Sequence, residues 1–317
     1  MNKPATTYEL TDYRTSGLKE IPYLKKGDKI AITCPAKKLP KPMDDAVALL
    51  TSWGLEVVIG ETVNASYHQF AGDDDLRAKD LHRFIDDDSI KAIIAARGGY
   101  GTVRIIDKID FSRFAANPKW VVGFSDITVL HAHLFANYQA QTIHGQMPVN
   151  IPDASKYSID TLRKALFGEE LSYQLSVHDL NRLGETTGVL IGGNLSLLVA
   201  VLGSVSDYDY DGKILFIEDV GEYLYSIDRM IRALDRAGKL KNLAGLIVGG
   251  FTDLKDNDIP FGQTVPEIIM EVVKTYDYPV CFDFPAGHIS DNQSLIFGRR
   301  LTIKVGSTQV IANYTNL

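Results

Sequence analysis

The chain has 317 residues, of which 45% are hydrophobic and 23% charged, and its formal net charge is −7 at pH 7. This composition is typical of a folded globular protein and excludes a disordered or fibrous chain, and the length is sufficient for two domains. The sequence has no dense basic stripe, which argues against a nucleic-acid partner. It also has no apolar run approaching the ~20 residues that a membrane helix needs, so we expect no membrane partner.

The first residues show no apolar segment of the kind found in secretory signals, and residues 1–21 are expected to form a polar N-terminal leader. The two cysteines, Cys34 and Cys281, lie far apart and match neither a zinc-binding spacing nor a disulfide framework. We therefore expect buried, reduced thiols in a cytoplasmic protein.

From residue 22 to residue 150, short β-rich runs alternate with helical patterns. Strands are predicted over residues 28–33, 55–59, 89–96 and 119–124, and helices over residues 41–53, 73–86 and 126–137. The helix over 73–86 opens on a run of aspartates, which suits the positive end of a helix dipole. This alternation predicts βαβ units around a parallel sheet, forming an N-terminal domain over residues 22–150.

The pattern loosens over residues 151–185, where we expect a connecting segment with one helix over 159–167. A second α/β unit is predicted over residues 186–317. Its expected elements are strands over 188–194, 213–217 and 245–248, helices over 223–237 and 265–275, and short strands near Pro279, Ser294 and Leu301. The expected fold class is therefore α/β, with a parallel-sheet N-terminal domain and a smaller C-terminal α/β domain. Two domains make a cleft between them possible.

The strongest local signal is a Gly-x-Ser sequence at Gly123–Ser125, between an apolar strand and a helical pattern. Such a strand–turn–helix elbow lifts a serine hydroxyl above the sheet edge, close to a helix N-terminus that stabilises an oxyanion. Ile127 stands where the hydrolase elbow has a second glycine, so the match is incomplete. The alternative interpretation is that Ser125 merely caps the helix.

A nucleophilic serine needs a base and an orienting carboxylate. Among the seven histidines, His288 is the best candidate base because it lies in a loop after a short apolar strand. His131 and His133 point to different faces of one predicted helix and are interpreted as structural. Glu218 ends an almost purely apolar strand and is the best candidate carboxylate; the alternative is a capping or ion-pairing acid, with Arg229 as its partner. Asp219 and Glu222 are nearby rivals and are interpreted as acids in the first turn of a helix.

A glycine-rich loop at Arg97–Gly101 follows the predicted strand over 89–96. It lacks the spacing of a phosphate-binding loop, but its free backbone N–H groups would suit an oxyanion or a carboxylate. The turn at Ile191–Asn194 is similar. A nucleotide- or phosphate-binding enzyme and a non-catalytic ligand-binding module both remain alternatives to an enzyme with a nucleophilic serine.

Five motifs together resemble the LD-carboxypeptidases. These are the murein tetrapeptide carboxypeptidases, a family of serine peptidases that includes the microcin-C immunity peptidases. The motifs occur in the family's order and cover residues 97–101, 123–126, 192–194, 216–219 and 286–288. The resemblance extends from about Leu24 to Val310, which is nearly the whole chain.

The resemblance implies a two-domain α/β fold whose N-terminal domain carries the nucleophile and whose C-terminal domain carries the acid and the base. The active site would therefore lie in the cleft between the two domains. By matching motifs, Ser125 would be the nucleophile, Glu218 the orienting carboxylate and His288 the general base. The backbone N–H groups of Gly99 and Asp126 would form the oxyanion hole.

The resemblance also implies substrate contacts from Arg97, Gly98 and Asn194. The expected reaction is hydrolysis of the amide before a C-terminal D-amino acid, which converts a murein tetrapeptide to a tripeptide and D-alanine during cell-wall recycling. The expected partner is this small peptide, and the enzyme would work in the cytoplasm as a homodimer without metal or cofactor.

The microcin-immunity branch of the family stacks an aromatic side chain on a nucleotide base. Here the only tryptophans, Trp53 and Trp120, lie in the N-terminal unit, and the connecting segment offers Tyr157, Phe167 and Tyr173. This distribution favours a cell-wall peptide over an aminoacyl-nucleotide amide as substrate. Because tyrosines can also stack, the second substrate class remains an alternative.

Overall fold

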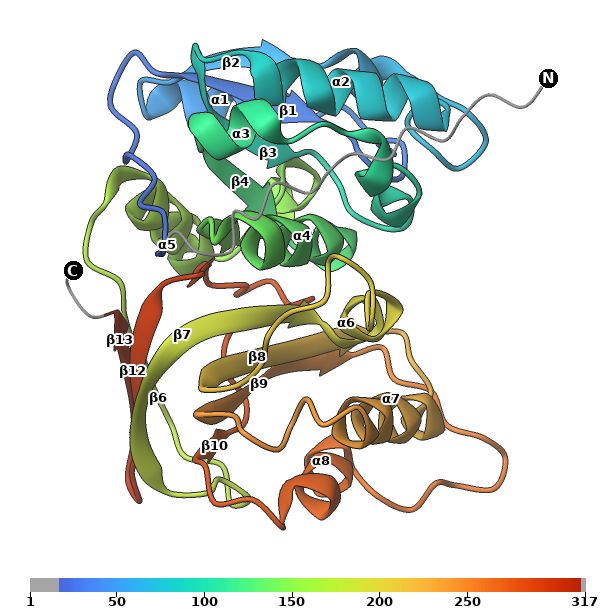
Figure 1. Cartoon of the computed structure of the whole chain (residues 1–317), viewed down its shortest axis with the longest axis vertical. Coiled ribbons are helices and arrows are strands. Elements are labelled where there is room, and N and C mark those ends of the chain that lie inside the picture. The colour runs from blue at the N-terminus through green and yellow to red at the C-terminus, as the bar shows by residue number, and fades with distance from the viewer. Residues whose placement is uncertain (1–16, 315–317) are drawn as a thin grey trace.

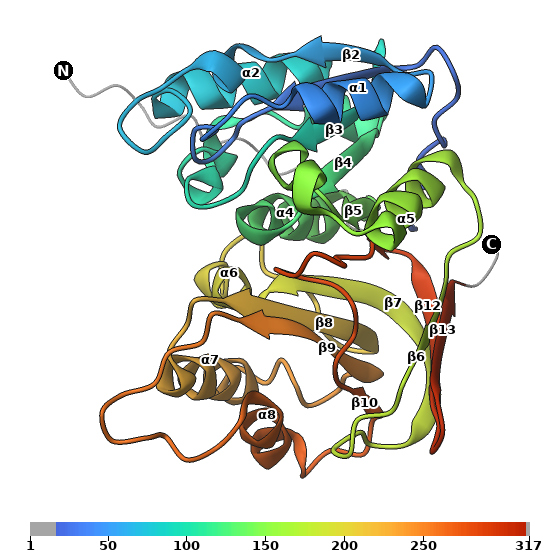
Figure 2. The ribbon, with the colours of Figure 1, turned by 180° about the vertical axis from the view of Figure 1, so that it is seen from behind.

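The computed structural model describes residues 17–314 and contains two β-sheets, one built mostly from the N-terminal half of the chain and one from the C-terminal half. Figures 1 and 2 show the sheets at opposite ends of the molecule, with helices α4 and α5 between them. Of the expected leader, residues 1–16 lie outside the described part of the chain. Within the described part, none of the helices has the length and apolarity needed to cross a membrane.

The N-terminal sheet has six strands in the order β11-β5-β4-β3-β1-β2, all parallel except β11. Its strands are β1 (Lys29–Thr33), β2 (Glu56–Ile59), β3 (Ile90–Ala95), β4 (Trp120–Gly123), β5 (Thr142–His144) and β11 (Leu295–Phe297). The associated helices are α1 (Asp44–Ser52), α2 (Asp74–Asp86), α3 (Ser112–Ala116), α4 (Thr128–Tyr138) and α5 (Lys156–Phe167). Strands β1, β3 and β4 are buried on both faces, as their nearly continuous apolar sequences require.

The C-terminal sheet has seven strands in the order β10-β9-β8-β7-β12-β13-β6. Its strands are β6 (Ser172–Leu175), β7 (Gly184–Asn194), β8 (Lys213–Val220), β9 (Gly245–Thr252), β10 (Val280–Cys281), β12 (Arg300–Val305) and β13 (Val310–Tyr314). Its helices are α6 (Leu195–Ala200), α7 (Leu224–Arg236) and α8 (Val265–Val273). With one strand more than the N-terminal sheet, this part is not the smaller one in strand count.

Short 3₁₀ helices join several of these elements. They are η2 (Glu61–Asn64), η3 (Thr102–Arg104), η4 (Ile106–Lys108), η5 (Ser125–Ile127) and η6 (Pro148–Asp153). The predicted α/β class is confirmed, and most predicted strands and helices are present with ends shifted by a few residues. At the start of α2, for example, Asp73 lies just outside the helix and its carboxylate accepts a hydrogen bond from Leu76 N at 2.8 Å.

Three features differ from the sequence-based expectation. Strand β8 does not end at Glu218 but continues to Val220, with a register shift against β9 between Ile217 and Asp219. Strand β6 forms within the segment expected to connect the domains, and β13 was not predicted at all. Strand β11 follows the C-terminal helices in sequence but pairs with β5 of the N-terminal sheet.

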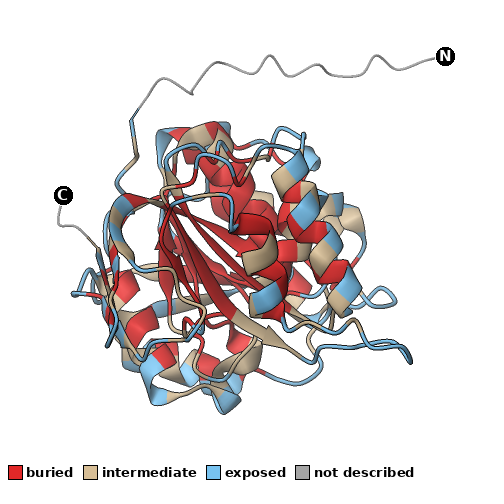
Figure 3. Ribbon diagram, turned by 90° about the horizontal axis from the view of Figure 1, so that it is seen from below, coloured by how far each residue is buried: buried red, intermediate tan, exposed pale blue. Residues whose placement is uncertain are grey.

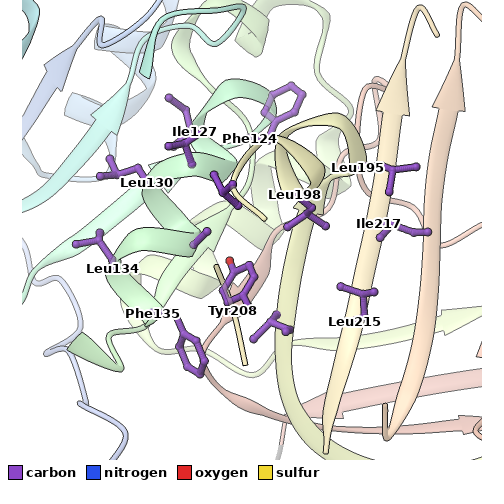
Figure 4. Close-up of a cluster of buried hydrophobic side chains, with 14 of the residues drawn as sticks. Phe124, Ile127, Leu130, Leu134, Phe135, Leu195, Leu198, Tyr208, Leu215 and Ile217 are labelled. Carbon is purple, nitrogen blue, oxygen red and sulfur yellow. The ribbon is translucent and has the colours of Figure 1, made fainter. Parts of the chain in front are cut away.

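A continuous hydrophobic core joins the two halves of the chain (Figure 4). One cluster of buried side chains contains Phe124, Ile127 and Leu130 of the N-terminal half. The same cluster contains Leu198 and Ile217 of the C-terminal half. Figure 3 shows the buried strands at the centre of the molecule, with exposed residues on the surrounding helices and loops. The core therefore fixes η5 and α4, which follow β4, against the C-terminal sheet.

Candidate active site

Ser125 occupies the sharp turn between strand β4 and helix α4. It begins the 3₁₀ helix η5 and has a backbone φ of +64°, an uncommon and strained value for a residue with a side chain. A Cβ atom at Gly123 would lie 2.8 Å from Ile127 Cγ1, so the turn requires glycine there. Among the described residues the Ser125 hydroxyl has no hydrogen-bond partner, so it does not cap the helix.

Glu218 and His288 are brought into direct contact, although 70 residues separate them in sequence. Glu218 lies in β8 with a fully buried side chain, and its Oε2 is 2.6 Å from His288 Nδ1. Gly287 permits this contact, because a Cβ there would lie 2.8 Å from Glu218 Cβ and the backbone φ is +115°. Arg229, the alternative partner of Glu218, instead hydrogen-bonds Ser226 and lies over the ring of Tyr225.

The environment of His288 favours its protonated form. Burial is the largest influence and acts to lower the pKa of His288, but the charge and hydrogen bond of Glu218, with smaller contributions from Asp219 and Asp253, raise that pKa above its ordinary value. When the imidazole is neutral, its Nδ1–H donates to Glu218 and leaves Nε2 free to accept a proton. The pair therefore has the arrangement of a general base oriented by a carboxylate.

The site lies between the two halves of the chain. The ring of Phe124, the residue before Ser125, packs edge-on against His288 with centroids 4.9 Å apart. A cavity of about 310 Å³ opens beside this contact and is lined by residues of both halves: Phe124, Gln146, Asn150, Asp153, Val220, Asp253, His288, Ile289 and Ser290. No hydrogen bond joins Ser125 to His288 within residues 17–314, so the structure brings the acid and base together and places the serine nearby.

The glycine-rich loop lies against Ser125. A Cβ at Gly98 would be 2.9 Å from Ser125 Cβ, so the loop backbone contacts the elbow directly. Gly99 follows with a φ of +110°. In η5 the first helical hydrogen bond runs from Ile127 N to Phe124 O, so the helix itself does not use the N–H of Asp126. The loop and the elbow thus offer N–H donors around the serine.

Two other predicted site residues have polar side chains that are engaged within the protein. Arg97 Nη1 donates to the carbonyl oxygen of Lys38 at 2.6 Å. Asn194 is 3% exposed, accepts a hydrogen bond from Leu197 N at the start of α6, and donates from Nδ2 to Asp219 Oδ1 at 2.8 Å. These contacts tie Arg97 to the backbone of Lys38, and Asn194 at the end of β7 to Asp219 of β8.

Asp219, a neighbour of Glu218, was expected in the first turn of a helix, and this expectation is wrong because the strand continues past Glu218. It lies in β8 with a buried side chain, and burial, followed by the charge of Glu218, raises its pKa to about 6. Besides Asn194, its carboxylate accepts a hydrogen bond from Ser196 N at 3.0 Å. The signal that could have identified it is the pair of adjacent acids at the end of an apolar strand.

The two histidines of helix α4 have hydrogen-bond partners within the protein. His131 Nε2 lies 2.9 Å from Gly123 O, and His133 Nδ1 lies 3.0 Å from Ser206 Oγ. Burial lowers the pKa of both imidazoles to about 4, so both remain neutral at physiological pH. Across residues 17–314, no group of three His, Cys, Asp or Glu side chains is arranged to hold a metal ion.

Comparison with known proteins gives consistent matches over most of the chain. Residues 30–145 match the LD-carboxypeptidase N-terminal domain, and residues 187–303 match the LD-carboxypeptidase C-terminal domain. A protein of Bacillus subtilis named "Probable murein peptide carboxypeptidase" is 35% identical, covering 91% of this chain and 92% of that protein.

Solved structures agree with these matches. Muramoyltetrapeptide carboxypeptidase from Oxalobacter formigenes superposes with a TM-score of 0.82 at 28% identity, covering 91% of this chain and 99% of that one. The microcin C7 self immunity protein MccF shares the fold, with a TM-score of 0.84 at 20% identity over 93% of this chain and 98% of its own. The two domain matches and the 35% identical relative show that this chain belongs to the LD-carboxypeptidase family.

Proposed function

We propose that this protein is a serine-type LD-carboxypeptidase that releases the terminal D-alanine of a murein tetrapeptide, with Ser125, Glu218 and His288 as its catalytic triad. The observation that carries this proposal is the 2.6 Å contact between Glu218 and His288 beside the strained turn of Ser125. The family and the activities for which its relatives are named support the same reaction class.

The proposed mechanism begins with proton transfer from Ser125 Oγ to His288 Nε2 as Oγ attacks the carbonyl carbon before the terminal D-alanine. Substrate binding must first bring the hydroxyl and Nε2 within hydrogen-bond reach, as is common in unliganded hydrolases. The backbone N–H groups of Gly99 and Asp126 would stabilise the oxyanion of the tetrahedral intermediate. Glu218 would hold the imidazole and stabilise its charged form.

Collapse of the intermediate breaks the amide bond. The departing amine takes the proton from the imidazolium of His288 and leaves as D-alanine, while the remaining tripeptide stays as an ester on Ser125. A water molecule then attacks the ester, with His288 again accepting a proton, and releases the tripeptide acid and the free serine. No step needs a metal or a cofactor. The proposed substrate contacts are made by Arg97 and Gly98 of the glycine-rich loop and by Asn194 at the end of β7.

The experiment that tests this proposal is mass spectrometry of a murein tetrapeptide incubated with the protein. We expect loss of one alanine residue from the peptide and recovery of free D-alanine. The matched control is the same peptide ending in L-alanine, which should remain intact. An unchanged tetrapeptide, or equal cleavage of the two peptides, would overturn the assignment.

One observation favours a second candidate function, hydrolysis of aminoacyl-nucleotide amides. Trp120 is buried, and Trp53 packs against Phe167, but Tyr157 on α5 is 74% exposed and could stack on a base. Measuring the cleavage rates of a glutamyl sulfamoyl nucleoside and of the tetrapeptide distinguishes the two candidate functions. Faster cleavage of the nucleoside would make the second function the main one.

We also propose a cytoplasmic, homodimeric enzyme acting in peptidoglycan recycling, as the family resemblance implies. The two thiols, Cys34 and Cys281, are free and buried, which suits a reducing compartment. Cell fractionation tests the location, and light scattering on the purified protein tests the dimer. Recovery outside the cytoplasm, or a monomeric mass, would contradict these parts of the proposal.

A further inference from the structure

One peptide group in the glycine-rich loop is held from both ends by buried, charged side chains. Arg77 Nη1 donates to the carbonyl oxygen of Gly101 at 2.9 Å, and Asp126 Oδ2 accepts from the N–H of Thr102 at 2.8 Å. These two backbone groups belong to the same peptide unit. Because a peptide unit is planar, holding its C=O and its N–H fixes its orientation.

The two side chains tie the loop to different parts of the N-terminal half. Arg77 belongs to α2, is fully buried, and also donates to Pro35 O at 2.6 Å and forms an ion pair with Asp74. Asp126 is fully buried and directly follows Ser125. Hydrogen bonds from or to charged groups are stronger than neutral ones, so this clamp is a firm anchor.

The loop has the kind of backbone that needs such an anchor. Gly99 and Gly101 have φ values of +110° and +145°. Glycine adopts such values readily, but it also makes the chain flexible at these positions. Space around them is tight, since a Cβ at Gly101 would lie 2.7 Å from Arg77 Nη1. The clamp fixes the C-terminal end of a loop whose N-terminal end already contacts Ser125 through Gly98.

Stability alone is a poor explanation for these two charges. Burial raises the pKa of Asp126. The hydrogen bonds from Thr102 and Gly101 and the charge of Arg77 act to lower that pKa, but they do not cancel the effect of burial. Replacing buried charges by apolar side chains of similar volume is often neutral or stabilising. Their position, one residue from the candidate nucleophile and on the loop of Gly99, points to a functional reason.

We propose that Arg77 and the side chain of Asp126 are positioning residues, which clamp the Gly101–Thr102 peptide and thereby hold the N–H of Gly99 in place opposite Ser125. This inference rests on the proposed function. Neither side chain would touch the substrate. Their effect is to pre-organise a donor that stabilises charge in the transition state, so they should act on kcat and leave substrate binding alone.

The test compares Asp126→Ala, Asp126→Asn and the control Arg104→Met in the full-length protein. Arg104 is exposed and pairs with Asp74, the same acid that Arg77 contacts. We expect Asp126→Ala to lower kcat by about 100-fold, the usual effect of losing one oxyanion donor, with KM changed by less than about threefold. Asp126→Asn keeps an oxygen acceptor for Thr102 and should recover to within about tenfold of the wild type. Arg104→Met should behave as the wild type.

Two further readouts separate positioning from a general loss of structure. The acid limb of the kcat/KM profile should stay in place in Asp126→Ala, because His288 is untouched. Amide hydrogen exchange over residues 97–103 should be faster in Asp126→Ala than in Arg104→Met. A kcat equal to that of the control, or a raised KM at normal kcat, would overturn the clamp.

The exchange measurement also keeps this inference distinct from the proposed function. If the wild type releases no D-alanine, the proposed function fails, and unchanged exchange over residues 97–103 would then reject the clamp as well. If Asp126→Ala does not fold, Arg77→Lys takes its place, since one ammonium cannot reproduce the planar contacts of the guanidinium. It should lose about tenfold in kcat, and wild-type kcat and exchange in that variant would reject the clamp.

Discussion

At the scale of single residues, the proposed chemistry depends on one buried carboxylate and one imidazole. Glu218 has no exposed surface, and its Oε2 holds His288 Nδ1 at 2.6 Å. In the proposed mechanism, a buried carboxylate in this position would fix the tautomer and stabilise the imidazolium formed during acylation. The two residues therefore contribute to one function, and the loss of either should appear in the rate of the chemical step.

The first prediction concerns Glu218→Gln, which keeps the shape of the side chain and removes its charge. We expect kcat to fall by at least about 100-fold, because the amide neither enforces the tautomer nor stabilises the imidazolium. KM should change far less. Steady-state kinetics of D-alanine release measures both quantities, and a raised KM with normal kcat would make Glu218 a binding residue.

The second prediction concerns the pH dependence of the same pair. The raised pKa of His288 means that the base is protonated, and inactive, up to a higher pH than a free imidazole. The acid limb of kcat/KM should therefore lie above the ordinary histidine value of 6.5. In Glu218→Gln the His288 imidazole stays buried but loses the attraction of the carboxylate. The pKa of His288 should then fall, and the acid limb should move to lower pH. An acid limb unaffected by this substitution would show that His288 is not the titrating base.

Sequence reasoning could identify several residues of the candidate site because they lie in short motifs at the ends of apolar strands. Ser125 follows a Gly-x-Ser pattern and Glu218 interrupts an apolar run, so each has a local signal. Arg77 has no such signal, since it lies within an ordinary amphipathic helix. Its role depends on contacts with Gly101 and Pro35 that no local pattern reveals.

At the scale of elements, the site depends on a glycine loop that packs tightly against a strand–turn–helix elbow. Gly98 lies so close to Ser125 that an added Cβ would be 2.9 Å from Ser125 Cβ and 3.2 Å from its Oγ. The elbow has the hydrophobic core behind it, so the loop is the element that would move. Small displacements of catalytic groups reduce rates strongly.

The third prediction follows from this packing. Gly98→Ala should lower kcat by at least about tenfold, because the methyl group pushes the loop and its N–H donors away from Ser125. The control is Gly17→Ala, where an added Cβ meets nothing within 4 Å. D-alanine release by the two variants is compared at saturating tetrapeptide. Equal kcat values would show that the loop does not contribute to catalysis.

At the scale of the whole molecule, two sheets from different halves of the chain form one core with the site between them. Thr128 of α4 accepts a hydrogen bond at its Oγ1 from Asn194 N of the other half, at 3.0 Å. Strand β11 crosses back to pair with β5. These contacts explain how Glu218 and His288 of the C-terminal half come to face the elbow of the N-terminal half.

The fourth prediction tests that connection. Thr128→Val removes the acceptor and leaves a buried N–H of Asn194 unpaired, which should lower the free energy of unfolding by about 1–3 kcal/mol. Thr187→Val is the control, because Thr187 pairs with Thr302 on an exposed part of the C-terminal sheet. Urea denaturation measures both variants. Equal stabilities would mean that the contact does not hold the two halves together.

The alternation of strands and helices was sufficient to predict the α/β class, because parallel strands with helical crossovers leave a strong periodic signal. The pairing of β11 could not be predicted from the same signal. Its three residues, Leu295–Phe297, are an apolar run that would fit either sheet, and the choice depends on contacts made after the chain folds. For the same reason the contact between Phe124 and His288 emerges only in three dimensions.

The most direct test of the central claim, that Ser125 is the nucleophile of an LD-carboxypeptidase, is a comparison of wild type and Ser125→Ala with the same murein tetrapeptide. We expect the variant to bind the peptide with similar affinity by calorimetry and to lose at least about 1,000-fold in the rate of D-alanine release. Near-normal release by Ser125→Ala would contradict the account.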